Sequence, residues 1–219
     1  MCQTESLRRC LIAVALCMAL LAWPAASDAQ LGGLLPSALP SPATTSTVVG
    51  DASAARVSVL GILGTAMTTA LADTGTLASA NDALDASMLA GGIPSALSAE
   101  TLSAATISWA DQVDSEASLG NLSMTVAGVG ITADFVMAEA SQVLGAAGSG
   151  SSTLTNLVIN GTPIAVTGAP NQAVWIPGGQ VILNEQTISS TGAAVVNALH
   201  VVITGVADVV VASATAGVS

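Results

Sequence analysis

Beyond its first 29 residues, the chain contains no cysteine, no lysine and no tyrosine. The three cysteines are Cys2, Cys10 and Cys17, so the rest of the chain can form neither a disulfide nor a cysteine-bound metal site. Arg56 is the one cation in that remainder, and the formal net charge of the whole chain is −11. Because neutralising phosphates needs several Lys or Arg side chains, this composition excludes nucleic-acid binding and binding to anionic membrane surfaces.

The first 29 residues have the layout of a secretory signal peptide. Arg8 and Arg9 precede an apolar run, and small residues lie before an expected cut after Ala29. The run is interrupted by Pro24 and is shorter than the roughly 20 residues that a membrane-spanning helix needs. Residues 1–29 are therefore predicted to be a cleavable signal peptide, and the protein is predicted to be extracellular or at the cell surface.

The remaining chain divides by composition into a lead and one domain. Residues 30–53 form a Pro/Ser/Thr-rich lead that is predicted to be flexible, and residues 54–219 form a single β-rich domain. The apolar stretch near the C-terminus contains Asp208. An Asp at a helix centre in lipid costs about 2.5–3.5 kcal/mol on insertion scales, so no membrane span is predicted in the mature chain.

Alternating apolar residues and turn dipeptides predict strands in most of the domain. Two of the alternating stretches are Leu122, Met124, Val126 and Leu199, Val201, Ile203. Asn160 and Gly161 favour a type I′ hairpin turn, since both positions need positive φ. The segments 121–140 and 197–214 resemble each other, each with a Gly-containing turn followed by Ala-Asp, which predicts repeated hairpins.

Two segments are expected to depart from this pattern. Leu77, Leu84 and Met88 follow near-helical spacing, which predicts a short helix or irregular loop over 80–90. The Gly/Ser-rich residues 148–152 are typical of a flexible loop. The predicted fold is all-β, a sandwich or Greek-key-like barrel of about ten short strands with a short helical insertion. A β-solenoid is the alternative, because hairpin units recur.

Several short stretches resemble bacterial choice-of-anchor P surface proteins. They lie between about residue 55 and the C-terminus, at residues 106–117, 131–140, 157–161, 168–171, 176–179, 183–186, 197–201 and 208–213. The resemblance implies a secreted or cell-surface β-rich protein with no established enzymatic role. Members often carry a sorting tail, and the last residues here show no such pattern, so release or non-covalent surface association is expected.

Few residues offer site chemistry. Asp111, Asp114 and Glu116 cluster after Trp109 and are a weak Ca²⁺ candidate, since hard cations bind carboxylate oxygens. A solvated acidic loop is the simpler interpretation. His200 is the only histidine, and no Gly-x-Ser-x-Gly elbow accompanies it, so a structural role is predicted. No catalytic residue and no cofactor other than weak Ca²⁺ is predicted.

The function that this sequence predicts is structural or adhesive, without catalytic activity. The partner would be an unknown extracellular molecule or a second copy of the chain. A Ca²⁺- or glycan-binding module is the first alternative. A secreted hydrolase that uses carboxylates or His200 is the second.

Overall fold

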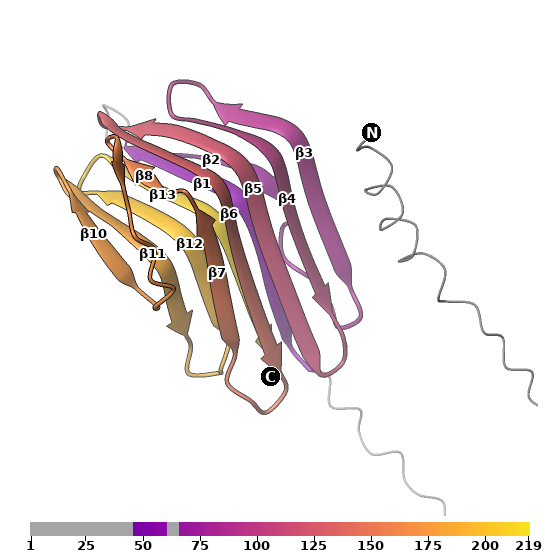
Figure 1. Cartoon of the computed structure of the whole chain (residues 1–219). Helices are drawn as coiled ribbons and strands as arrows, with labels where there is room; N and C mark the ends of the chain where they lie inside the picture. Colours follow the sequence, from indigo (N-terminus) through magenta and orange to yellow (C-terminus); the bar gives the residue numbers. More distant parts are fainter. Residues whose placement is uncertain (1–45, 61–65) are drawn as a thin grey trace, which may run out of the picture. The chain divides into compact units, whose positions relative to one another are not determined.

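The computed structural model describes residues 46–60 and 66–219. These residues form two antiparallel sheets of six and seven strands that pack face to face, which is the architecture of a β-sandwich (Figure 1). Within the described ranges there is no helix, and neither sheet closes into a barrel. The all-β prediction and its sandwich variant are confirmed, whereas the barrel and the solenoid are not what the chain adopts.

Sheet A has the strand order β10-β11-β12-β13-β1-β2, so the first and last strands of the chain lie side by side in it. Its strands are β1 Val48–Leu60, β2 Ala66–Asp73, β10 Gln172–Ile176, β11 Gly179–Ile188, β12 Ala194–Ile203 and β13 Ala207–Val218.

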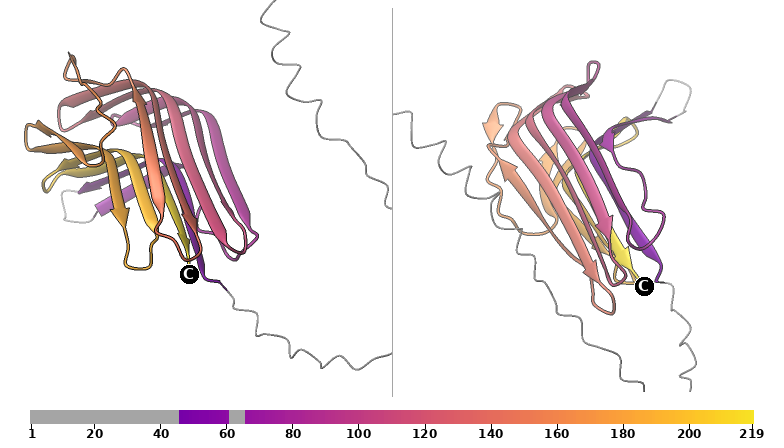
Figure 2. Two further views of the ribbon diagram at one scale, coloured as in Figure 1. Left: turned by 60° about the horizontal axis from the view of Figure 1, so that its bottom comes forward. Right: turned by 90° about the vertical axis from the view of Figure 1, so that its right-hand side faces the viewer.

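Sheet B has the order β3-β4-β5-β6-β8-β9, and β7 also pairs with β6. Its strands are β3 Ala83–Ile93, β4 Leu97–Ser108, β5 Gln112–Val126, β6 Val129–Val143, β7 Ser149–Thr155, β8 Val158–Ile159 and β9 Thr162–Pro163. Figure 2 shows the two layers from below and from the side on which β3 is the edge of sheet B.

The core lies between the sheets, where β13 packs on β5 and β6 and β1 packs on β4 and β5. The predicted alternation places the expected side chains there: Leu122, Met124, Val126, Leu199, Val201 and Ile203 are all buried. Many of their outer neighbours are small or polar, such as Ser123 and Thr125, so each sheet has one dry face and one solvated face.

The predicted hairpins are confirmed by their turns. Ala127 and Gly128 join β5 to β6 with φ of 48° and 83°, and Asn160 and Gly161 join β8 to β9 with φ of 49° and 77°. Positive φ at both central residues is the requirement of a type I′ turn, whose twist matches that of the flanking strands. Pro163 lies in the terminal strand β9, as expected of a residue that cannot donate to a ladder.

A crease crosses sheet A from one side to the other. On β13 the buried positions change phase, since Val209 and Val211 are buried and so are Ala212 and Ala214. Ala212 has φ of 53°. On the neighbouring strands the buried positions change phase in the same row. The pairing register between strands is therefore the same on both sides of this row. The crease row of sheet A consists of Asn184, Ala198, Ala212, Ala54 and Ala72.

In sheet B the buried positions also change phase, and hydrogen bonds from side-chain amides stabilise the backbone there. Asn121 has φ of 48° and donates from Nδ2 to Oε2 of Glu100 at 2.8 Å. Asn156 has φ of 53° and donates to Oδ2 of Asp134 at 2.6 Å. Asn tolerates the left-handed region better than most residues, because its short polar side chain can bond locally. Sheet A thus bends without losing register, whereas in sheet B the pairing of β4 with β5 shifts register on either side of Glu100.

The helix predicted over 80–90 is wrong, because this segment is the edge strand β3. It pairs with β4 from Ala83 opposite Ile107 to Ile93 opposite Leu97. The near-helical spacing of Leu84 and Met88 does not describe a buried face, since Leu84 is half-buried and Met88 is exposed. Pairing with β4 supplies the long-range hydrogen bonds that override the local spacing.

Two boundaries also differ from expectation. The Gly/Ser-rich residues 148–152 are not a loop: β7 starts at Ser149, and its one glycine, Gly150, allows close approach to Val196 of β12. The first strand starts at Val48, before the domain boundary expected at residue 54. The signal peptide and most of the lead lie outside the described residues. The strands number more than the ten expected, and β5 and β6 each reach 15 residues.

Candidate functional site

The outer face of sheet B contains a hollow of ≈ 710 Å³, which we call the sheet B hollow. Five strands, β3 to β7, contribute to its lining. Its floor is made of small or aliphatic side chains, among them Ala83, Ala105 and Ile107. The hollow therefore offers an apolar floor that spans several strands.

Four carboxylates point into this hollow. Asp85, Glu116 and Glu139 lie in one row across the sheet, in which Ala105 separates Asp85 from Glu116. Asp114 lies two residues from Glu116 on the same face of β5. Neighbouring strands are about 4.8 Å apart, so the row spreads its negative charge over roughly 14 Å.

Glu116 and Glu139 are direct cross-strand partners, which places two like charges opposite each other. Such pairs destabilise a sheet. Ser151 donates from Oγ to Oε2 of Glu139 at 2.8 Å, and Gln112 donates from Nε2 to Oδ2 of Asp114 at 2.8 Å. These neutral donors orient two of the carboxylates without neutralising them.

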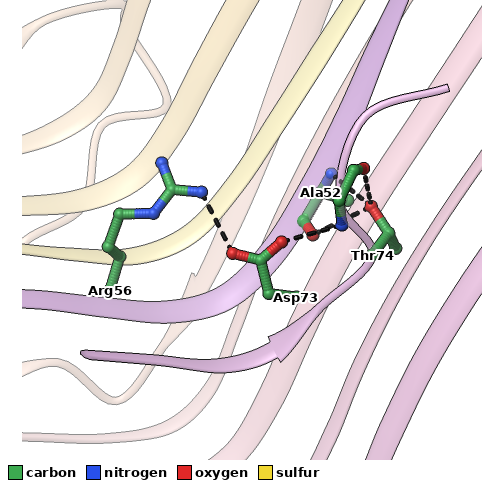
Figure 3. A network of polar contacts seen from close by, with 5 residues as sticks. Ala52, Arg56, Asp73 and Thr74 are labelled. Carbon is green, nitrogen blue, oxygen red and sulfur yellow. Dashed lines mark hydrogen bonds and ion pairs between the residues drawn. The ribbon is translucent and has the colours of Figure 1, made fainter. Parts of the chain in front are cut away.

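The one arginine of the described residues does not neutralise the hollow. Arg56 lies on sheet A and pairs with Oδ2 of Asp73 at 3.3 Å (Figure 3). Asp73 also accepts a hydrogen bond from the backbone N of Gly75, and the Thr74 hydroxyl accepts one from the backbone N of Ala52. Arg56 therefore stabilises the junction between β1 and the end of β2. The outer face of sheet B keeps its full negative charge.

The three predicted calcium ligands are divided by the structure. Asp114 and Glu116 both face the hollow. Asp111 lies in the turn before β5 and is not part of the lining, although its carbonyl accepts the backbone N of Leu144 at 2.8 Å. Among the residues that the structure describes, no three His, Cys, Asp or Glu side chains form a group that could hold a metal ion. The calcium site remains a prediction.

Glu139 and Asp85 complete the row, and sequence reasoning did not assign them to it. A signal for Glu139 was present. Counting outward along both strands from the two-residue turn at Ala127 and Gly128 brings residue 116 opposite residue 139. Asp85 had no such signal, because its segment was expected to be helical.

A second polar cluster lies on the outer face of sheet A around His200. Its Nδ1 lies 2.8 Å from Oε2 of Glu185, and its Nε2 lies 3.3 Å from Oδ1 of Asp208. Asn197 donates to the same Glu185 oxygen at 2.7 Å. Both ring nitrogens face carboxylates, so neither is placed to take a proton from a serine. This arrangement lends no support to a serine hydrolase and fits a structural histidine.

The cluster changes the titration of its members. The hydrogen bond with the Glu185 carboxylate raises the pKa of His200 above its ordinary value of 6.5, against the opposing effect of burial. The hydrogen bond with His200 lowers the pKa of Glu185 below its ordinary value of 4.5. A protonated His200 thus bridges β11 and β13 through Glu185 and Asp208.

The cluster predicts a pH dependence of stability. The contribution of His200 is full below its unfolded-state pKa and is lost as the pH rises through the higher folded-state value. That of Glu185 is present above its unfolded-state pKa and is lost as the pH falls through its lowered value. From pH ~6 to ~9 we expect the free energy of unfolding to fall by about 1–2 kcal/mol, which urea unfolding at several pH values measures.

The variant His200→Gln is the control for this prediction, because Gln can hydrogen-bond to Glu185 but does not titrate. We expect its stability to be nearly flat over the same pH range. A Gln variant with an unchanged slope would show that the pH dependence arises elsewhere in the chain.

Comparison of the chain with protein-family models, with curated proteins and with solved structures gave no match. No helix in the described part of the chain is long and apolar enough to cross a membrane.

Proposed function

We propose that the protein is an exported, non-catalytic adhesion module that binds Lys- or Arg-rich peptide segments of an extracellular partner in the sheet B hollow. The observation that carries the proposal is the row of Asp85, Glu116 and Glu139, which lies away from Arg56, the one Lys or Arg among the described residues. The resemblance of the sequence to choice-of-anchor P surface proteins supports the same role.

The floor of the hollow favours basic side chains over small cations alone. Lys and Arg place their methylene stems on apolar surface while their charged ends remain in contact with water or a carboxylate. Ala105 and Ile107 provide such a surface beside Asp114 and Glu116. A peptide that lies across the strands along this row would meet Asp85, Ala105, Glu116 and Glu139 in turn.

The proposal is tested by calorimetric titration with an oligolysine peptide. Glu116→Gln combined with Glu139→Gln removes two charges from the hollow. The matched control, Glu100→Gln with Asp134→Asn, removes two charges from the same sheet outside the hollow and keeps acceptors for Asn121 and Asn156. We expect the first pair to weaken binding by about tenfold at low salt, since two exposed ion pairs contribute ~0.4–2 kcal/mol.

The control pair should change the affinity by less than about twofold. Added salt should weaken binding of the peptide to the unmodified protein. Equal losses of affinity in the two double variants would show that only the net charge matters, and the hollow would then not be the binding site.

Calcium binding at Asp114 and Glu116 is the second candidate, because both carboxylates face the hollow, but no three His, Cys, Asp or Glu side chains of the described residues form a metal-binding group. Thermal melting with and without added Ca²⁺ tests this candidate separately, because Ca²⁺ that binds the folded state raises its melting temperature. A glycan ligand has less support: Trp109 and Trp175, the exposed indoles, do not line the hollow.

A further inference from the structure

We propose that the free edge of β3 pairs with the β3 of a second copy of this chain, antiparallel, and joins two copies of sheet B across a twofold axis. This inference is independent of what binds in the hollow. It follows from the position of β3 at the end of sheet B, where β4 is its only paired neighbour among the described residues.

The other described sheet ends are short or covered. β9 has 2 residues and includes Pro163, and β10 has 5 residues. The Gly150 carbonyl of β7 accepts a hydrogen bond from Nε2 of Gln186 at 3.0 Å. β2 is shorter than β3 and ends at the ion-paired Asp73. Natural proteins blunt their edges with brevity, proline, charge or cover.

β3 lacks these protections. It is 11 residues long, contains no Pro and no Lys, and carries Asp85 as its one charged residue. Leu89 is 89% exposed and Met88 is 39% exposed. A long edge with exposed apolar side chains offers unpaired backbone groups and apolar contact at the same place, which is what strand addition uses.

A second copy fits this edge because antiparallel pairing of identical strands is self-complementary. With the axis near Met88, each Asp85 lies opposite Gly91 of the other copy, and the two Asp85 residues are about 20 Å apart along the strands. That separation exceeds the Debye length of ~8–10 Å at moderate salt, so the two Asp85 charges are largely screened from each other. Pairing would also make the acidic outer faces of two sheets B continuous.

The overall negative charge of each copy opposes association, so the proposal predicts that dimerisation depends on the salt concentration. Sedimentation equilibrium of the exported protein should show a monomer–dimer equilibrium that strengthens several-fold from low salt to ~0.5 M NaCl. Ligand binding in the acidic hollow should weaken over the same range, so the two proposals fail separately.

The variant Leu89→Lys adds a charge to the exposed edge and should abolish the dimer. Leu144→Lys is its control, because Leu144 is also exposed but lies outside β3. Hydrogen exchange of the unmodified protein supplies a second readout, with protection of the outward β3 amides that rises with protein concentration. A protein that stays monomeric at every salt concentration, or a dimer that survives Leu89→Lys, would overturn the proposal.

Discussion

Replacing Ala212 by valine is expected to lower the free energy of unfolding by about 2–5 kcal/mol. Ala212 is completely buried on β13 and has φ of 53°, in the left-handed region. A branched side chain there meets its own backbone carbonyl as well as the packed core. Because the same row runs through β11, β12, β13, β1 and β2, this strain would act where the sheet bends.

Ala214→Val is the matched control. Ala214 is equally buried on the same strand, but it does not have positive φ. The free energy of unfolding of the Ala214→Val variant should fall by about 1–3 kcal/mol from overpacking alone. Urea unfolding followed by circular dichroism measures both variants. If Ala212→Val is no more destabilising than Ala214→Val, the crease does not have the backbone conformation described.

Replacing Gly150 by alanine is expected to cost about 2–3 kcal/mol. A Cβ at this position would contact Cγ2 of Val196 and lie 2.6 Å from the carbonyl oxygen of Glu139. Neither neighbour has room to move, since Val196 is 1% exposed and the carbonyl belongs to β6. The change would push β7 away from β12 and distort the Ser151 side of the sheet B hollow.

Gly130→Ala provides the comparison within the same sheet. The nearest atom to its added Cβ is Oδ1 of Asn160 at 4.0 Å, so no clash is expected. Alanine should leave stability unchanged or raise it by up to about 1 kcal/mol through the unfolded state. Thermal and urea unfolding of the two variants test the difference. Equal effects would mean that β7 does not pack on β12 as described.

The turns were predictable because their chemistry is local. Asn160 and Gly161 specify their hairpin by themselves, and so does the Gly-containing turn between β5 and β6. Strand β3 was not predictable in this way. Its pairing with β4 is a non-local property, and edge strands have weak alternation of their own.

The change of phase at the crease also makes strands harder to predict from the alternation of apolar residues. On β5 the buried Leu119 and Leu122 are three residues apart, a spacing that strict alternation does not produce. The candidate site shows the same limit. Asp114 and Glu116 are visible as neighbours in the chain, but Glu139 and Asp85 join them only through the register of β3 to β6.

The central claim is that the outer face of sheet B binds basic peptide segments. An amide chemical-shift titration of the ¹⁵N-labelled protein with oligolysine tests it most directly. We predict shifts concentrated on β3 to β7 around Glu116 and Glu139, with the amides near His200 on sheet A unchanged. Shifts confined to sheet A, or no shifts at low salt, would contradict the claim.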